Sequence, residues 1–262
     1  MPNWAENVLY VTKGDATLVW DAIHNPDRLQ NPKYPDYDDT AFDFNRLIPM
    51  PEELHNCGPI GTMSRIADDL LAGNGIGDFA QYRWVKEAGI VTVEQLCAHW
   101  NYDYNEVVAL GKLRQENREK YGCADWYEWH NNNWGTKWNA CNVHFSYKPE
   151  YKGTVLVFDT AWAPPMPVME KLFAMFPDHE FKYSWWETTN SFGDLYIVRN
   201  GKIVEGEKLK ITCMHADCEN EGTEMAADCL YYCAKHAAES EEHDFGFDRD
   251  EQALQQWEAG QQ

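Results

Sequence analysis

A chain of 262 residues is long enough to bury one core plus a satellite module, or to form two small domains. Its composition, 44% hydrophobic and 14% aromatic, excludes a largely disordered protein, and the chain has no apolar run long enough for a transmembrane helix. Against 22 Lys and Arg stand 43 Asp and Glu, and the resulting net charge of −21 disfavours direct binding to nucleic-acid phosphates. This negative charge favours a partner with a basic surface. The alternative is that the charge only keeps the protein in solution.

The first stretch predicts a strand, a helix and a second strand. Asn7–Thr12 is apolar and rich in β-forming residues, and Gly14 and Asp15 supply a turn and an N-cap for a helix over Ala16–Ile23. A Pro-rich loop then leads to a strand expected over Ala41–Ile48. The side chains expected to face inward from it are Phe42, Phe44 and Leu47.

Residues 63–121 have helical periodicity broken by glycines, which predicts a helical insertion. The segment Gly73–Asp78, GNGIGD, would be a phosphate-binding loop only if it followed a strand and opened a helix. Because a helical pattern precedes it, we expect a turn between helices.

Strand-like segments then return, interrupted by one amphipathic helix that three prolines introduce. The predicted strands are Cys141–Tyr147, Thr154–Thr160, Phe181–Trp186, Leu195–Val198 and Lys202–Val204, and the predicted helix is Val168–Phe176. Asn200-Gly201 predicts a tight hairpin between the last two strands. The order of elements indicates an α+β fold, with helices on one face of an antiparallel sheet.

Between the insertion and these strands lies a tryptophan-rich segment, Asp125–Ala140. One interpretation is an aromatic plug that closes the sheet. The other is a recognition surface of aromatic rings with a single cation. The residues of this candidate binding surface are Trp129, Trp134, Lys137 and Trp138.

Three motifs carry a family resemblance: MPNW at the N-terminus, WGTKWNA at Trp134–Ala140, and FDTAWAPP at Phe158–Pro165, followed by Phe192-Gly193. They resemble the Api-type, or YubB-like, proteins of phages and plasmids. The resemblance covers roughly residues 1–62 and 122–205 and implies a ferredoxin-like fold and a mobile-element origin. It implies no activity and hence no catalytic residues. Ala5 stands where the family pattern has Cys, and the insertion and the C-terminal cysteines look like elaborations.

Four residues near the C-terminus have the spacing of a metal site: Cys213-x4-Cys218 and Cys233-x2-His236. Tetrahedral Zn²⁺ takes four such S and N ligands, and a closed Cys3His set is structural, because no position is open for water. Without a signal peptide at Met1–Val11, metal binding is favoured over disulfides, and we expect the cytoplasm of a bacterial host. Reduced, unmetallated cysteines remain an alternative, and His215 or Cys229 could replace one ligand.

These observations predict five segments: two halves of a ferredoxin-like core at 1–62 and 122–206, the insertion at 63–121, a zinc module at 207–240 and an acidic tail at 241–262. No nucleophile or metal-hydrolase motif is present, so no catalytic residue is assigned. The favoured hypothesis is a non-enzymatic phage-type accessory protein that binds a basic host protein, as a DNA mimic blocking a host defence system would. The alternatives are a nucleic-acid or nucleotide-binding module, with the sheet and tryptophans as stacking surfaces, and an enzyme of unrecognised type. Homo-oligomerisation is left open.

Overall fold

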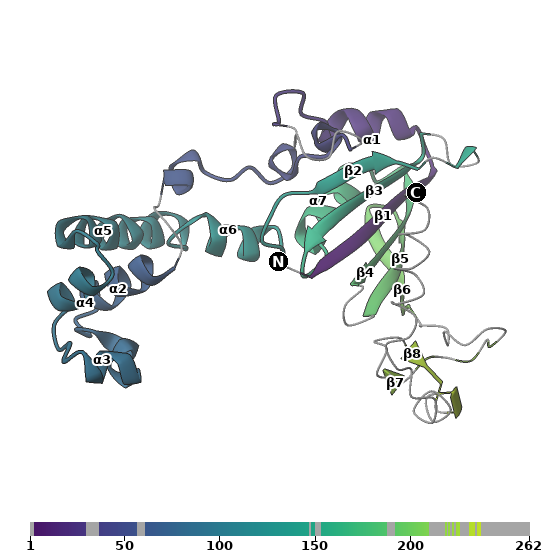
Figure 1. The fold of residues 1–262 in the computed structure, drawn as a ribbon. Coiled ribbons are helices and arrows are strands. Elements are labelled where there is room, and N and C mark those ends of the chain that lie inside the picture. Colours follow the sequence, from purple (N-terminus) through teal and green to yellow (C-terminus); the bar gives the residue numbers. More distant parts are fainter. Residues whose placement is uncertain are drawn as a thin grey trace, which may run out of the picture.

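The computed structural model describes residues 3–29, 37–56, 61–146, 148–149, 153–187 and 192–209, with isolated positions between 218 and 236. Figure 1 shows a twisted sheet with two helices packed against it and a helical arm that projects from one end. None of the helices in the described part of the chain has both the length and the apolar character of a membrane span.

Six antiparallel strands form the sheet, in the order β2-β3-β1-β4-β5-β6. Their bounds are β1 Trp4–Lys13, β2 Cys141–Phe145, β3 Val155–Ala161, β4 Glu180–Glu187, β5 Phe192–Arg199 and β6 Lys202–Lys208. The predicted hairpin is confirmed: Asn200 and Gly201 both adopt positive φ between β5 and β6, as a tight turn requires.

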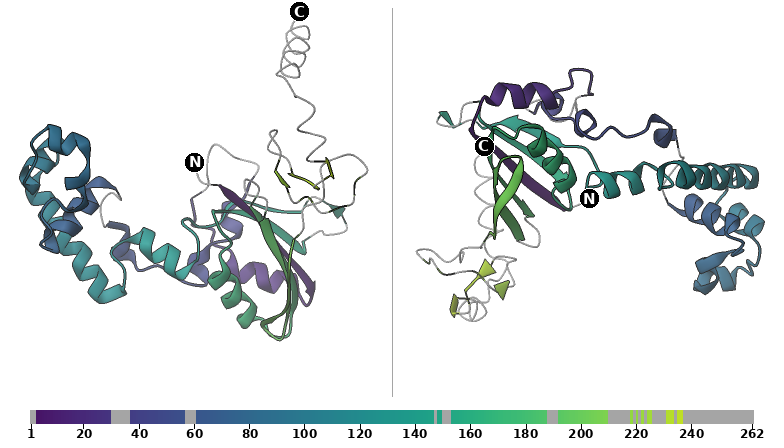
Figure 2. Two further views of the ribbon diagram at one scale, coloured as in Figure 1. Left: turned by 90° about the horizontal axis from the view of Figure 1, so that it is seen from below. Right: turned by 180° about the vertical axis from the view of Figure 1, so that it is seen from behind.

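One face of the sheet carries the main core. Ala5, Leu9 and Val11 alternate along β1 and are buried beneath helices α1 and α7, which cover the same face (Figure 2). Helix α1 spans Ala16–Ile23 and α7 spans Met166–Met175. The α+β fold with helices on one face is therefore confirmed.

The expected strand over Ala41–Ile48 is wrong. The chain there forms two 3-10 turns, η1 (Asp39–Ala41) and η2 (Phe44–Arg46). The side chain of Asp38 accepts a hydrogen bond from the Thr40 amide, and that of Asp43 accepts one from the Asn45 amide. These local caps curl the backbone away from an extended path. The residues expected to face inward, Phe42, Phe44 and Leu47, are nevertheless all buried.

The helical insertion is confirmed as a helical unit with a core of its own, which includes Ile66, Phe79, Leu96 and Val107. Its elements are α2 Thr62–Leu71, η4 Gly77–Gln81, α3 Arg83–Glu87, α4 Val93–His99 and α5 Tyr104–Tyr121, reached through η3 Glu52–Asn56. Gly73 and Gly75, between α2 and η4, and Gly77, the first residue of η4, all take positive φ, so GNGIGD is a turn between helices, as predicted.

Helix α6 (Trp126–Asn133) connects this arm to the sheet (Figure 1). Asp125 caps its N-terminus by accepting a hydrogen bond from the Glu128 amide. Gly135, at φ +79°, closes its other end by donating its amide to the carbonyl of His130. The tryptophan-rich segment therefore begins as a helix and leads directly into β2.

Candidate functional site

Three of the four predicted metal ligands lie together. The Sγ atoms of Cys218 and Cys233 are 4.0 Å apart, and Sγ of Cys233 is 3.5 Å from Nδ1 of His236. All three ligand atoms lie within 4.8 Å of one another, and Cys233 and His236 are buried. This cluster could hold a metal ion. The fourth predicted ligand, Cys213, and the possible substitutes His215 and Cys229 lie outside the described residues.

Local structure brings these ligands together. Two short strands, β7 (Glu224–Met225) and β8 (Tyr231–Tyr232), pair antiparallel, and Cys233 follows directly after β8. His236 follows three residues later, and its Nδ1 lies 3.5 Å from Sγ of Cys233. Around Zn²⁺, bonds of about 2.3 Å to sulfur and 2.0–2.1 Å to nitrogen at tetrahedral angles separate ligand atoms by about 3.5–3.8 Å. The observed spacing is close to that geometry.

The predicted binding surface is divided between the core and the exterior. Trp129 and Trp134 are only 6% and 1% exposed, and Nε1 of Trp134 donates a hydrogen bond to the carbonyl of Ile48. These two rings pack edge to face and belong to the main core. The structure thus places Trp129 and Trp134 where the aromatic-plug interpretation puts them, whereas Lys137 and Trp138 of the same segment are only half-buried.

Lys137 lies among three aromatic rings. Its Nζ is 4.7 Å from the ring centroid of Trp138, 5.1 Å from that of Trp162 and 5.7 Å from that of Tyr127. Each distance is within the roughly 6 Å over which a ring face attracts a cation. We call these three rings, Tyr127, Trp138 and Trp162, the aromatic cage.

A cleft of about 590 Å³ opens beside the cage, lined by Trp126, Tyr127, Lys137 and Trp138. Trp138 also contacts Trp4, with ring centroids 5.8 Å apart. Trp4 and Trp162 converge here because β1 and β3 pair antiparallel, with Trp4 opposite Ala161. Sequence reasoning assigned no binding role to Tyr127 or Trp162, although the FDTAWAPP motif contains Trp162.

Trp162 is held in an unusual backbone conformation. Its φ is +70°, in the left-handed region that bulky side chains avoid. Its amide donates a hydrogen bond to the carbonyl of Asn3, and its side chain remains 41% exposed. A strained residue of this kind persists only where its surroundings fix it. The fold thus holds the indole of Trp162 at the surface, within reach of Lys137.

The buried side chain of His130 fixes the backbone of Lys137 through a hydrogen bond. Its Nδ1 lies 2.8 Å from the carbonyl of Lys137, and its ring stacks on Trp134 with centroids 3.9 Å apart. Burial lowers the pKa of His130 to about 4, against the opposing effect of that backbone hydrogen bond. The ring is therefore neutral at pH 7, and Nδ1 must be the nitrogen that donates. Its buried Nε2 has no hydrogen-bond partner among the described residues.

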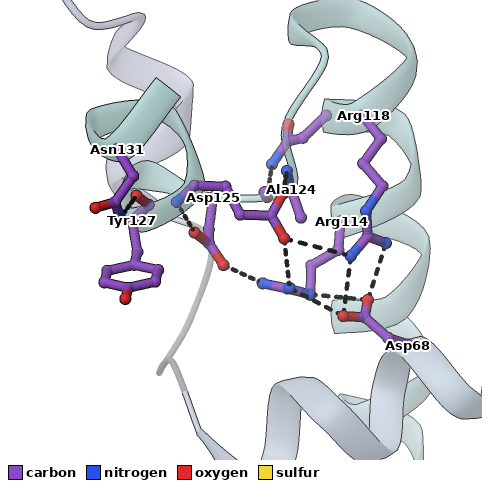
Figure 3. A network of polar contacts seen from close by, with 9 residues as sticks. Asp68, Arg114, Arg118, Ala124, Asp125, Tyr127 and Asn131 are labelled. Atoms are coloured by element: carbon purple, nitrogen blue, oxygen red, sulfur yellow. Dashed lines mark hydrogen bonds and ion pairs between the residues drawn. The ribbon is translucent and has the colours of Figure 1, made fainter. Parts of the chain in front are cut away.

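An ion-pair network joins α6 to the insertion (Figure 3). Arg114 of α5 contacts Asp68 of α2 at 3.0 Å and Asp125 at the start of α6 at 2.5 Å. Arg118 reaches the same Asp68 carboxylate at 2.9 Å. Although burial acts to lower the pKa of Arg114, hydrogen bonds to Asp68 and Asp125 outweigh it and raise that pKa. The arm is thus tied electrostatically to the helix that lines the cleft.

Two aspartates, Asp159 within FDTAWAPP and Asp194 directly after Phe192-Gly193, both have polar partners in the chain. Asp159 accepts a hydrogen bond from Nδ2 of Asn142 at 2.7 Å, and burial raises the pKa of its carboxyl. Asp194 pairs with Nζ of Lys208 at 2.9 Å.

Residues 133–233 match the family described as a ferredoxin-like domain in Api92-like protein. This match confirms the resemblance carried by WGTKWNA and FDTAWAPP. It continues past residue 206 and includes Cys213, Cys218 and Cys233. Among solved structures, the chain is similar to the crystal structure of a protein Api92 from Yersinia pseudotuberculosis. Identity is 14% over 80% of this chain and 99% of that one, with a TM-score of 0.37, too low to indicate a shared overall arrangement. No curated protein matches the chain.

Proposed function

We propose that this chain, which carries the ferredoxin-like domain of Api92-like proteins, acts by binding another protein that has a basic surface. On this proposal it is a non-enzymatic accessory protein of a mobile element and works in the cytoplasm of a bacterial host. Its partner would be a nucleic-acid-binding host protein, for example one that belongs to a defence system. The acidic chain would compete with nucleic acid for the partner's basic channel.

The distribution of charge is the observation that supports this proposal. Residues 207–262 contain 14 Asp and Glu against 4 Lys and Arg, so about half of the net charge of −21 comes from this last fifth of the chain. A concentration of one sign steers association with a surface of the opposite sign and raises its rate. The same charge repels phosphates.

The test is capture from a bacterial lysate on the immobilised full chain at low salt. We expect basic nucleic-acid-binding proteins to be retained at low salt and released at about 1 M salt, where the Debye length falls to about 3 Å. Added duplex DNA should release the same proteins, because a DNA mimic and DNA compete for one surface.

Two double variants, each of which removes two negative charges, test whether capture of the partner depends on the acidic tail. The double variant Glu241→Gln and Glu242→Gln removes two charges from the acidic tail, and Glu106→Gln with Glu116→Gln removes two exposed charges from the described helix α5. The tail variant should weaken capture and the α5 variant should not. Retention that survives both DNA and high salt would argue against the proposal.

We further propose that the Cys218, Cys233 and His236 cluster holds a structural Zn²⁺, with Cys213 as fourth ligand. Support comes from the ligand spacing and from the chemistry of the donor set, two thiols and an imidazole. Four protein ligands leave no position for substrate, so the ion would stabilise the segment and take no part in catalysis.

The exposed rings favour one alternative, binding of single-stranded nucleic acid or a nucleotide by stacking on Trp126, Trp138 and Trp162. Such stacking surfaces normally work together with a basic groove, and here Lys137 is the single cation that lines the described cleft. A gel shift with single-stranded DNA tests this alternative. We expect no shift at physiological salt.

A further inference from the structure

We propose that the aromatic cage recognises a basic side chain of a partner protein, and that Lys137 is an internal occupant which the partner displaces. The cage would take the ammonium or methylated ammonium of a lysine, or the guanidinium of an arginine. This proposal rests on the proposed function in one respect, namely that the partner is basic. It identifies the aromatic cage as the part of the chain that contacts the partner.

The arrangement of the rings carries this inference. Three ring faces from separate segments converge on one ammonium at 4.7 to 5.7 Å: Tyr127 on α6, Trp138 before β2, and Trp162 after β3. Each ring presents the negative face of its quadrupole to the cation. Cages of this kind suit an ammonium, because several ring faces replace part of its hydration shell.

Three aromatic rings surround the ammonium group of Lys137. Some surface lysines of the chain pair with carboxylates, Lys13 with Glu180, Lys120 with Glu53 and Lys208 with Asp194, whereas others, such as Lys112 and Lys171, form no ion pair with a described residue. Among the residues that the structure describes, Lys137 has no carboxylate partner, although Asp and Glu outnumber Lys and Arg almost two to one. The rings hold its ammonium group.

The cage is accessible to a partner. Trp162 is 41% exposed, and the cleft of about 590 Å³ adjoins Tyr127 and Trp138, which gives an incoming side chain a route to the rings. The strained backbone of Trp162 shows that the fold keeps this ring at the surface against its local preference. Lys137 has a flexible four-carbon stem and can swing out into solvent.

Displacement of Lys137 from the cage predicts a specific change in the affinity for an external cation. If Lys137 occupies the cage for most of the time, the apparent affinity for an external cation is reduced by the fraction of molecules with an empty cage. Replacing Lys137 by Ala must then tighten binding of a cation. In an anion site the same replacement would weaken binding, because Lys137 would itself be the ligand. The direction of the effect of one substitution therefore separates the two chemistries.

The experiment titrates the full-length protein with a short peptide that carries one trimethyllysine, followed by NMR. Methyl protons that enter the cage should shift upfield because of the ring currents of the indoles. We expect Lys137→Ala to bind at least about threefold more tightly than the unaltered chain. Trp162→Gly should bind more weakly, and Lys171→Ala, which removes an exposed lysine from α7, should bind unchanged. Tyr127→Ala serves as a second wall variant should Trp162→Gly not fold.

Three results would overturn the inference: equal or weaker binding by Lys137→Ala, methyl shifts that survive loss of a cage ring, or binding of acetate or inorganic phosphate that Lys137→Ala abolishes. The titration uses no host protein. Failure of lysate capture with an intact peptide response would therefore count against the proposed function alone, and the converse result against the cage alone.

Discussion

Arg114 and Asp125 form an ion pair in which the two side chains are only 5% and 3% exposed, and this pair joins the helical arm to the helix that lines the aromatic cleft. The carboxylate of Asp125 makes two contacts. Its Oδ1 accepts a hydrogen bond from the Glu128 amide and so caps α6, and its Oδ2 accepts one from Nη1 of Arg114. The position of the arm and the start of α6 are therefore set by the same side chain (Figure 3).

Breaking this pair should be costly. Arg114→Met leaves Asp125 buried without its cation, and the loss of one partner of a buried pair destabilises a protein by about 3–5 kcal/mol. Urea unfolding of the full chain measures this. The control is Arg83→Met, which breaks the Arg83–Glu87 pair, whose side chains are 89% and 60% exposed, and should cost less than about 0.5 kcal/mol. Equal losses in the two variants would contradict the assignment.

The depressed pKa of His130 predicts a pH dependence of stability. The unfolded imidazole takes up a proton near pH 6.5, whereas the buried one does so only near pH 4. The unfolded state therefore binds more protons between these values, and stability falls as the pH drops through this window, by at most about 3 kcal/mol. Unfolding at pH 7 and pH 4.5 should show a smaller difference for His130→Phe than for the unaltered chain. Identical differences would show that His130 is not the group responsible.

A buried polar network in the sheet predicts a second stability effect. The hydroxyl of Tyr183 donates to Oδ1 of Asn7 at 2.6 Å, and both side chains are fully buried. Tyr183→Phe leaves that oxygen without this donor, which should cost about 1–3 kcal/mol. Tyr82→Phe, at a residue that is 38% exposed, is the matched control and should be neutral in the same unfolding experiment.

Metal analysis tests the cysteine cluster. We expect about one Zn²⁺ per chain in the purified protein and its loss in Cys233→Ser. Cys141→Ser makes the same change at a thiol that donates to the carbonyl of Asn139, away from the cluster, and should retain the metal. A metal content that Cys233→Ser leaves unchanged would exclude Cys233 as a ligand.

Trp162 offers a test of backbone strain. Glycine adopts φ +70° without a steric penalty, so Trp162→Gly relieves about 1–2 kcal/mol of strain. This gain offsets the loss of a ring that is 41% exposed, and the variant should unfold within about 1 kcal/mol of the unaltered chain. Trp162→Ala removes the same ring without relieving the strain and should be less stable than Trp162→Gly.

Features that depend on interactions between residues close in the sequence could be predicted, whereas features that depend on long-range contacts could not. Asn200-Gly201 and the β-forming residues of Asn7–Thr12 are local signals, and both predicted the structure. The segment Ala41–Ile48 also has strand-like alternation, but Asp38 and Asp43 cap short turns there, and that side-chain chemistry overrides the pattern. The cluster of Cys218, Cys233 and His236 could be found because these residues lie close together in the sequence.

The aromatic cage could not be found in the same way. Its walls at Tyr127, Trp138 and Trp162 come from three segments, which long-range contacts bring together, such as the hydrogen bond that the Thr136 hydroxyl donates to the carbonyl of Ala161. A single sequence does not reveal such contacts. The signal that was available, three tryptophans in the motifs WGTKWNA and FDTAWAPP, did not distinguish a ring in the core from one at the surface.

The position of β1 has a consequence for how the protein is made. This first strand pairs with β3 and β4 alone, so its partners end at Ala161 and Glu187. During synthesis, β1 is made before its partner strands β3 and β4. The helical arm, which has its own core, is already complete at Tyr121. We therefore expect the arm to fold first during synthesis, while β1 stays unpaired until β3 has been made.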